Sequence, residues 1–578
     1  MDKNTVLAFV LMGIVLIGMP YYNDFFFPQE PVTEQVETER TAPDQDRDPQ
    51  QSTPPVMQEE MQSSDQLAAK PETVSEKPAS ETKERLPEST IHVSSPLYSG
   101  KITTRGGVIS SWNIDAYENR SGGPVAMVDP GKRANLGISF RTMDGDTVHS
   151  IQNDFYLVGR DSRSEHRLTV NPDNQETITL RCDLDEQRYI EKRYTFFGDR
   201  YDIELEVVLK GIAPDVVDGK YFIHWDSAVP MSENNPKDEL KYVKSYALLG
   251  SDIEDFEVDE EEVEVLNLSG NTQWISTRTK YFGAAVIPQD NVGSGAILRG
   301  YQQEYGEEIN REYSLSLAMP MGQEQVVSDK FIVFMGPLEY TLINGYNVDL
   351  EQMMDFGWKF IRPLAKMIYN LFTFMHNYIS NYGIIIILFS IFVKIIFHPL
   401  TKKSYISMQA MKELQPKMAA INEKYAKDPQ TKNQKVMQLY KEEGVNPLGG
   451  CLPLLLQMPV FFAIYPVFYS TIDFRGAAFA GWITDLSLPD YVFSLPFSLP
   501  MYGSEVAILP IFMAVSMFVQ SAMNLADPKQ KMMVYMMPVM MLLFFNNISS
   551  GLVLYWSMFN LLALLEQRLI KMWHQSPA

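Results

Sequence analysis

Long apolar segments in the second half of the chain constrain its fold more than any other feature of the sequence. They occupy residues 382–397, 451–469, 506–523, 532–545 and 552–565. A helix that crosses a lipid bilayer needs roughly 20 apolar residues, or roughly 17 at the short end. Several of these segments reach that length only when their polar ends are included. The pattern therefore predicts five membrane-spanning helices in a bilayer that is thin or distorted around them.

Another apolar segment, at residues 6–19, follows Asp2 and Lys3 near the amino end. It has the length of a signal peptide, but no small-residue cleavage site comes after it, because Pro20 and then aromatic residues follow. We therefore interpret residues 1–28 as an uncleaved signal anchor, which is the first of six predicted spans. A cleaved signal peptide is the alternative.

The distribution of basic residues predicts the direction of the spans. Lysine and arginine gather in three segments after the second span, at residues 401–448, 529–531 and 568–571. The segment 471–504, in contrast, contains Arg475 as its one basic residue. Because loops rich in lysine and arginine stay in the cytoplasm, both termini are predicted inside and residues 25–380 outside.

The predicted outer region divides by composition into a linker and a folded domain. Residues 29–90 are rich in Pro, Glu, Gln, Ser and Asp, which cannot bury a core, so a disordered acidic linker is predicted. Residues 91–345 contain short alternating or β-branched stretches between Gly, Asn and Asp, which favour a large antiparallel β-sandwich. These stretches lie at 99–104, 108–114, 177–182, 201–208, 220–225, 281–287 and 331–334.

Three further segments have distinct compositions. The acidic stretch 252–264 is interpreted as a solvated loop, with a docking surface for a partner as the alternative. Residues 346–381 are predicted to form an amphipathic helix at the outer membrane surface. Residues 401–445 are predicted to form a cytoplasmic hairpin of two helices with a break near Asp428.

Charge and residue usage argue against several classes of function. The formal net charge of −23 does not suit nucleic-acid binding, which needs a basic surface. Cys182 and Cys451 are predicted on opposite sides of the membrane, so no disulfide is expected. No histidine pair has metal-ligand spacing, no Gly-rich phosphate loop occurs, and no acidic pair stands out in the predicted sandwich. We therefore expect no metal, no cofactor and no enzymatic reaction, nucleotide hydrolysis included.

Several sequence blocks resemble those of a known family. Residues 446–459 read NPLGGCLPLLLQMP and lead into VFFAIY, and residues 398–408 read HPLTKKSYISM. Residues 550–556 read SGLVLYW, while TRGG at 104–107 and YFGAAVIP at 281–288 lie in the predicted sandwich. The blocks run in order along the chain, which resembles Gram-negative members of the YidC/Oxa/Alb family of membrane protein insertases.

The resemblance implies that residues 382–578 form an insertase core of five transmembrane helices. Their groove would open to the cytoplasm and to lipid but stay closed toward the periplasm. The expected function is an inner-membrane insertase and chaperone for nascent membrane proteins, alone or beside the Sec translocon, with the hairpin meeting the ribosome or the signal-recognition receptor.

The sequence leaves two other classes of function to consider. A secondary transporter or channel is the alternative, but no internal repeat is evident and five core spans do not divide into equal halves. A membrane-anchored periplasmic domain that binds or processes carbohydrates is a third, and the groove motifs argue against it.

Lys394 stands out because it lies in the apolar second span, between Val393 and Ile395. A charge at mid-span costs roughly 2.5–3.5 kcal/mol on insertion scales, so it should face water or an anionic partner. Alternatively its ammonium reaches the membrane surface near His398. The resemblance implies a positively charged groove residue here, usually arginine, and lysine keeps the charge without the planar fork.

Other residues of the spans extend the predicted site. Ser390 lies one turn before Lys394 on the same helical face, although a lone serine commonly bonds its own backbone. Gln457 and Gln520 are further groove candidates that could instead hold helices together. The resemblance adds candidate contacts for the substrate helix, namely Cys451, Pro453, Met458, Pro459, Phe461, Tyr555 and Trp556. For the prolines, a structural kink is the alternative.

Overall fold

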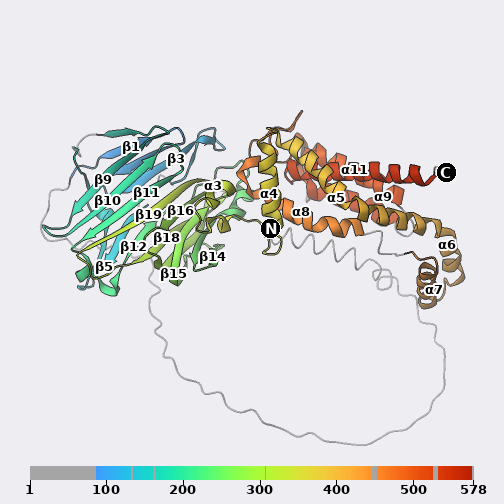
Figure 1. Cartoon of the computed structure of the whole chain (residues 1–578), viewed down its shortest axis with the longest axis horizontal. Helices are drawn as coiled ribbons and strands as arrows, with labels where there is room; N and C mark the ends of the chain where they lie inside the picture. The colour runs from blue at the N-terminus through green and yellow to red at the C-terminus, as the bar shows by residue number, and fades with distance from the viewer. Residues whose placement is uncertain are drawn as a thin grey trace, which may run out of the picture. The chain divides into compact units, whose positions relative to one another are not determined.

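The computed structural model describes residues 86–129, 131, 135–160, 165–305, 308–445, 452–500, 502–524 and 531–575. The predicted signal anchor at 1–28, nearly all of the predicted linker at 29–90, Cys451 and the side chain of Pro453 lie outside this description. Figure 1 draws the described chain as a β-rich part, blue to yellow-green, and a helical part, yellow to red.

The β-rich part begins with a five-stranded sheet in the order β4-β3-β2-β1-β8. Its strands are β1 (Thr90–Ser94), β2 (Tyr98–Thr103), β3 (Val108–Glu118), β4 (Pro124–Ala126) and β8 (His166–Thr169). The β1–β8 pair is parallel, which the antiparallel prediction did not include. Trp112 stacks on Tyr98 with ring centroids 4.6 Å apart. Gly100 makes room for the indole, because a Cβ there would lie 2.2 Å from the ring.

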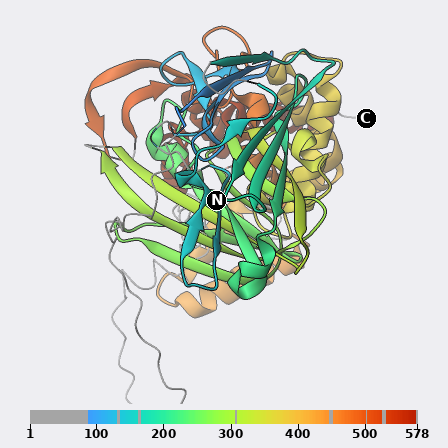
Figure 2. The same cartoon turned by 90° about the vertical axis from the view of Figure 1, so that its left-hand side faces the viewer.

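The second sheet has 14 strands, in the order β6-β5-β12-β18-β17-β15-β16-β19-β11-β10-β9-β7, with β13 and β14 joined through β15. The strands are β5 (Gly137–Arg141), β6 (Thr147–His149), β7 (Tyr156–Leu157), β9 (Gln175–Asp183), β10 (Tyr189–Phe197), β11 (Asp202–Lys210), β12 (Lys220–Trp225), β13 (Lys244–Leu249), β14 (Asp252–Phe256), β15 (Glu264–Arg278), β16 (Phe282–Pro288), β17 (Gly293–Tyr305), β18 (Glu308–Pro320) and β19 (Val326–Pro337). Figure 2 turns these strands toward the viewer.

One buried core joins the two sheets, since it includes Trp112 of β3 and Trp225 of β12. The domain is therefore a β-sandwich, as predicted. Each predicted strand segment overlaps a strand of the structure. Alternating side chains explain this agreement, because period-two burial is readable from the sequence wherever one face of a strand is covered.

The acidic stretch 252–264 is not simply a solvated loop, which corrects the prediction. Its first part, Asp252–Phe256, is β14 and pairs with β13. Beyond the strand, Glu257 and Asp259 form ion pairs of 2.9 and 2.5 Å with the buried Arg311 of β18. The local excess of acid is thus partly neutralised by a cation that is distant in the sequence.

The amphipathic helix predicted at 346–381 is shorter than expected. The structure instead has α3 (Tyr340–Asn344), a 3₁₀ turn at Leu350–Met353 and α4 (Arg362–His376). Asp349 and Gly357 have φ angles of 56° and 80°, and this left-handed backbone interrupts a helix. Pro363 lies in the first turn of α4, where a missing N–H breaks no helical hydrogen bond.

The helices of the second half are α5 (Tyr382–Glu413), α6 (Gln415–Lys424), α7 (Pro429–Glu442), α8 (Leu452–Ser470), α9 (Ile508–Asn524), α10 (Lys531–Phe545) and α11 (Ser550–Gln575). Of these, α5, α8, α9, α10 and α11 lie at the five predicted spans. Within the described residues, α5 alone is long and apolar enough by itself to cross a membrane. Shorter apolar helices lie at Leu455–Ser470, Ile508–Met523 and Tyr535–Phe545.

The predicted cytoplasmic hairpin starts inside a longer helix, because α5 continues past Pro399 to Glu413. The hairpin therefore combines the end of α5 with α6 and α7, and a break precedes α7 where it was predicted. Asp428 caps α7 by accepting a hydrogen bond of 3.0 Å from the backbone N–H of Thr431. Lys417 lies 2.5 Å from Glu443 and ties α6 to the end of α7.

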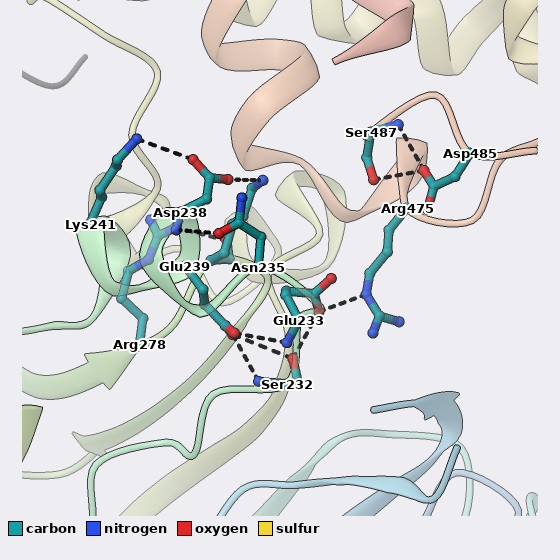
Figure 3. Close-up of polar contacts among 11 residues, drawn as sticks. Ser232, Glu233, Asn235, Asp238, Glu239, Lys241, Arg278, Arg475, Asp485 and Ser487 are labelled. Carbon is teal, nitrogen blue, oxygen red and sulfur yellow. Dashed lines mark hydrogen bonds and ion pairs between the residues drawn. The ribbon is translucent and has the colours of Figure 1, made fainter. Parts of the chain in front are cut away.

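The segment between α8 and α9 contacts the sandwich. It contains a 3₁₀ turn at Ile472–Phe474 and an unpredicted hairpin of β20 (Tyr491–Leu499) and β21 (Gly503–Ala507). Ile472 belongs to the buried core of the sandwich. Figure 3 shows Arg475 reaching the loop before α2 (Pro236–Glu239), where its Nε lies 2.9 Å from Glu233 Oε1.

Candidate functional site

Two charged side chains meet inside the helical part, one from α5 and one from α11. The ammonium of Lys394 lies 2.8 Å from Oε2 of Glu566, and these side chains are 9% and 8% exposed. Burial removes water from both groups, so their attraction is stronger than that of a surface pair. The sequence predicts that Lys394 faces either water or an anionic partner, and Glu566 is such a partner.

Two more side chains of α5 hold the other oxygen of the same carboxylate. Thr401 Oγ1 donates to Glu566 Oε1 at 2.8 Å, and His398 Nδ1 lies 2.6 Å from that atom. Lys394, His398 and Thr401 occupy positions i, i+4 and i+7, which place them on one face of α5. This spacing directs all three groups toward α11.

A cavity of about 390 Å³ lies close to the pair. Its lining residues come from α5, α9 and α11, and they are Tyr405, Met408, Gln409, Lys412, Glu413, Met523, Gln567, Ile570 and Lys571. Two lysines and one glutamate give this lining a positive balance. Tyr405 connects the cavity to the pair, because its ring centroid lies 5.8 Å from Lys394 Nζ, and Phe559 covers the ammonium at 4.7 Å.

The predicted groove residues differ in their burial and in their distance from the cavity. Lys394 is not among the residues that line the cavity, so direct contact between its ammonium and a hydrated groove stays a prediction. Ser390 is buried and its hydroxyl donates to the carbonyl of Ile386 at 2.8 Å, which is the backbone bond given as its alternative. Gln457 is buried, whereas Gln520 is half-buried and lies beside the Tyr405 hydroxyl.

The aromatic residues among the predicted substrate contacts pack inside the protein. Phe461 of α8 is fully buried against Trp556 of α11, with ring centroids 4.7 Å apart, and Tyr555 is equally buried. These three rings are therefore covered by the protein in this conformation, and their contact with a substrate helix stays a prediction. Met458 is half-buried and Pro459 is exposed, so both stay candidates.

Glu566 is the residue of this site that sequence reasoning missed. The last apolar segment of the sequence ends at residue 565, and the charged residues Glu566 and Arg568 follow it. Helix α11 instead continues to Gln575 and carries the carboxylate to Lys394. A signal was present, since a buried cation needs a counter-ion and an isolated acid bordering another apolar helix is a natural candidate.

The chain is similar to known proteins along its whole length. A family model described as 60Kd inner membrane protein matches residues 374–576, and one described as YidC periplasmic domain matches residues 90–371. Proteins named membrane protein insertase YidC include one from Chlorobaculum parvum, which is 33% identical with 99% of this chain and 94% of that protein covered. The protein of that name from Chlorobium luteolum is 34% identical, with 98% and 94% covered.

The chain is also similar to a solved structure described as an active YidC insertase crystal structure with the first transmembrane domain resolved. The alignment covers 84% of this chain and 92% of that chain, with 17% sequence identity and a TM-score of 0.36. The two family models together match most of the chain, and full-length relatives share a third of its residues. This chain therefore belongs to the YidC family of membrane protein insertases, with a YidC-type core and a periplasmic β-sandwich domain.

Proposed function

We propose that this protein inserts other membrane proteins into the inner membrane and helps them to fold, and that the polar tail of a substrate enters at the Lys394 site. One observation carries the proposal. A lysine is buried between α5 and α11, beside a cavity whose lining adds Lys412 and Lys571. Charges inside membrane helices are costly and are kept where they serve a function.

We further infer six spans with both termini in the cytoplasm. The spans are the predicted signal anchor at 1–28 and helices α5, α8, α9, α10 and α11. Contacts on the two sides of α8 support this direction. Arg475, after α8, pairs with Glu233 of the periplasmic domain, while the lysine-rich α6 and α7 precede α8.

The mechanism follows from the cost of moving polar groups through lipid. A substrate helix is stable in the bilayer, but the polar tail that flanks it must cross the apolar layer. The cavity shortens that layer and its lysines attract acidic residues of the tail, so the barrier falls without nucleotide hydrolysis. The substrate helix then passes into lipid beside α8, where Pro459 is exposed.

The hairpin provides a surface for partners that deliver substrates. Lys424, Lys427 and Lys435 are exposed on or between α6 and α7, which suits an acidic partner. We propose that this surface meets the ribosome or the signal-recognition receptor, and that the protein works alone or beside the Sec translocon.

Insertion into proteoliposomes tests the role of Lys394. A single-span substrate with an acidic tail is diluted from denaturant onto vesicles that hold the purified protein, and protease protection of the tail gives the rate. Lys394→Ala should slow insertion about tenfold, which corresponds to about 1.4 kcal/mol of lost attraction in the rate-limiting step. Lys394→Arg should insert as the wild type does, because the charge is kept.

Lys403→Ala is the matched control, since it removes an exposed lysine from the same helix and should leave the rate unchanged. If Lys394→Ala inserts the acidic substrate as fast as the wild type, charge attraction at this site is not part of the mechanism.

A further inference from the structure

The cation proposed to attract substrates is already neutralised by the protein itself. Among the described residues, Glu566 is the acid within ion-pair distance of Lys394. An acidic substrate residue that approaches Lys394 therefore meets a charge that Glu566 already neutralises. A short-range ion pair with the substrate forms only if Lys394 leaves Glu566 or contacts both carboxylates at once.

Stability alone does not account for this pair. Two charges that leave water for a protein interior lose hydration, and their mutual attraction often only balances that loss. Apolar side chains of similar volume commonly hold helices together as well or better. Since α5 and α11 already meet through rings such as Phe389 and Tyr555, whose centroids lie 5.9 Å apart, the helices do not depend on an ion pair for contact.

The two partners are held unequally, which decides which of them can move. Glu566 Oε1 is fixed by Thr401 and His398, whereas only Oε2 faces Lys394. The ammonium can donate three hydrogen bonds but has no further acceptor among the described residues, and aromatic rings face it instead. The lysine can therefore turn to a second carboxylate while Glu566 stays in place.

The cavity gives such a carboxylate a way to the lysine. Gln567, the neighbour of Glu566, and Tyr405, which faces the ammonium, are both part of its lining. Lys412 and Lys571 stand on the same lining and favour an acidic tail there. Tyr405 thus belongs both to the cavity lining and to the surroundings of Lys394.

We infer that Glu566 occupies the position at Lys394 that an acidic residue of a substrate would take. The carboxylate of Glu566 thereby determines how acidic a substrate tail must be to be accepted by the groove. Tails must displace or outweigh its carboxylate at Lys394, so a weakly acidic tail gains little and a strongly acidic tail gains more. Glu566 is thus a specificity-determining residue that acts through Lys394. This inference rests on the proposed function of Lys394.

The test uses the proteoliposome assay with one substrate whose tail carries no aspartate, one aspartate or two. Wild-type protein should insert the doubly acidic tail clearly faster than the other two. Glu566→Gln leaves Lys394 unpaired, so the tail with one aspartate should insert about tenfold faster than with wild type, a shift of the size expected for one exchanged ion pair. The neutral tail should insert at the wild-type rate.

Three companion variants separate the possible outcomes. Lys394→Ala combined with Glu566→Gln should lose the part of the preference for acidic tails that Lys394 adds and keep only the weaker preference set by Lys412 and Lys571, because neither charge of the pair remains. Glu566→Met removes the carboxylate with an apolar group of similar size, and it should repeat the Glu566→Gln result even if the amide disturbs folding. Glu423→Gln makes the same chemical change at an exposed position of α6 and should match the wild type.

The inference and the proposed function fail in different ways. If Glu566→Gln and Glu566→Met both leave the preference for acidic tails unchanged, or slow every tail alike, while Lys394→Ala still slows acidic tails, Glu566 is a structural residue and the inference is overturned. If the double variant keeps the wild-type preference for acidic tails, Lys394 does not read the tail charge and the proposed function falls as well.

Discussion

Lys192 of the periplasmic domain is a second buried lysine, and its environment contrasts with that of Lys394. Its ammonium donates to the carbonyls of Gly106, Gly107 and Leu136 at 2.9, 3.1 and 2.7 Å. Gly106 and Gly107 have left-handed φ angles of 75° and 57°, which other residues rarely adopt. This backbone conformation directs the two glycine carbonyls toward Lys192. Burial lowers the pKa of Lys192 to about 7, because the charged form loses hydration.

This pKa predicts a pH-dependent stability. Above pH 7 the folded chain has released the Lys192 proton, whereas the unfolded chain holds it up to its ordinary pKa of about 10.4. The unfolded state then binds more protons, so stability rises with pH in this range. Thermal unfolding in detergent, followed by tryptophan fluorescence, should show a higher midpoint at about pH 9 than at pH 7.

Lys192→Met should show a smaller rise, together with a lower midpoint overall because three carbonyls lose their donor. Lys101→Met, at an exposed position of the same domain, should keep the wild-type rise. An equal rise in Lys192→Met and the wild type would mean that another group carries the pH dependence.

The role of a single residue is predictable from the sequence where its neighbours along the chain define its environment. Lys394 was identified because a charge among apolar neighbours is conspicuous, and the need for water or an anion followed from its cost. Glu566 was not identified, because a partner distant along the chain is fixed by helix packing and not by spacing. The burial of Phe461, Tyr555 and Trp556 was missed for the same reason, since lipid, substrate and protein interior all favour aromatic residues.

At the scale of elements, periodic segments were predicted well and their ends were not. The strands of the sandwich are predictable from alternating or β-branched stretches, and the spans from the length of their apolar segments. The ends depend on single residues, such as Asp349 and Gly357, whose backbone angles stop the helix expected at 346–381. The hairpin of β20 and β21 was missed because β20 is almost entirely exposed, β21 is half-buried to buried, and neither strand shows a regular alternation of burial.

The cap of α7 gives a prediction about the hairpin of α6 and α7. Hydrogen bonds from the Thr431 side chain and backbone lower the pKa of Asp428, so its carboxylate is ionised and caps the helix near neutral pH. Asp428→Ala removes this acceptor, and the amides in the first turn of α7 should exchange hydrogen severalfold faster. Asp428→Asn keeps an acceptor and should exchange almost as the wild type does.

The cap should also weaken at acid pH. A carboxyl group whose folded pKa is lowered stabilises the helix above its ordinary pKa, and the contribution is lost as the pH falls through the lowered value. Mass spectrometry of the exchanged full-length protein measures both effects. Unchanged exchange in Asp428→Ala would show that the cap does not hold the end of α7.

At the scale of the whole molecule, the sandwich and the helices meet through a mixed polar and apolar contact. Arg475 pairs with Glu233, and Ile472 enters the sandwich core. Lys280 lies 2.8 Å from Asp238 and faces the Tyr469 ring of α8 at 5.1 Å. The sequence predicted both parts but not this contact, because it arises from loops that carry no periodic pattern.

The chain offers a natural cut between the two parts. Strand β19 ends at Pro337, and Tyr340 of the following α3 packs on Phe356 and Tyr369, with centroids 5.3 Å apart in both cases. The side chains around Lys394 and its cavity come from α5, α9 and α11. Removing residues 91–338 therefore takes away the contact at Ile472 and Arg475 while sparing the candidate site.

We accordingly expect the protein without residues 91–338 to insert acidic-tail substrates at close to the wild-type rate but to unfold at a lower temperature. The loss of stability follows from the uncovering of Ile472, Tyr469 and Arg475. Ile472→Ser in the full-length chain should lower the unfolding temperature in the same direction by less, because it opens only part of the contact. If the shortened protein is folded and abundant in the vesicles but inserts nothing, the periplasmic domain takes part in insertion itself, and the route through α5 and α11 is incomplete without it.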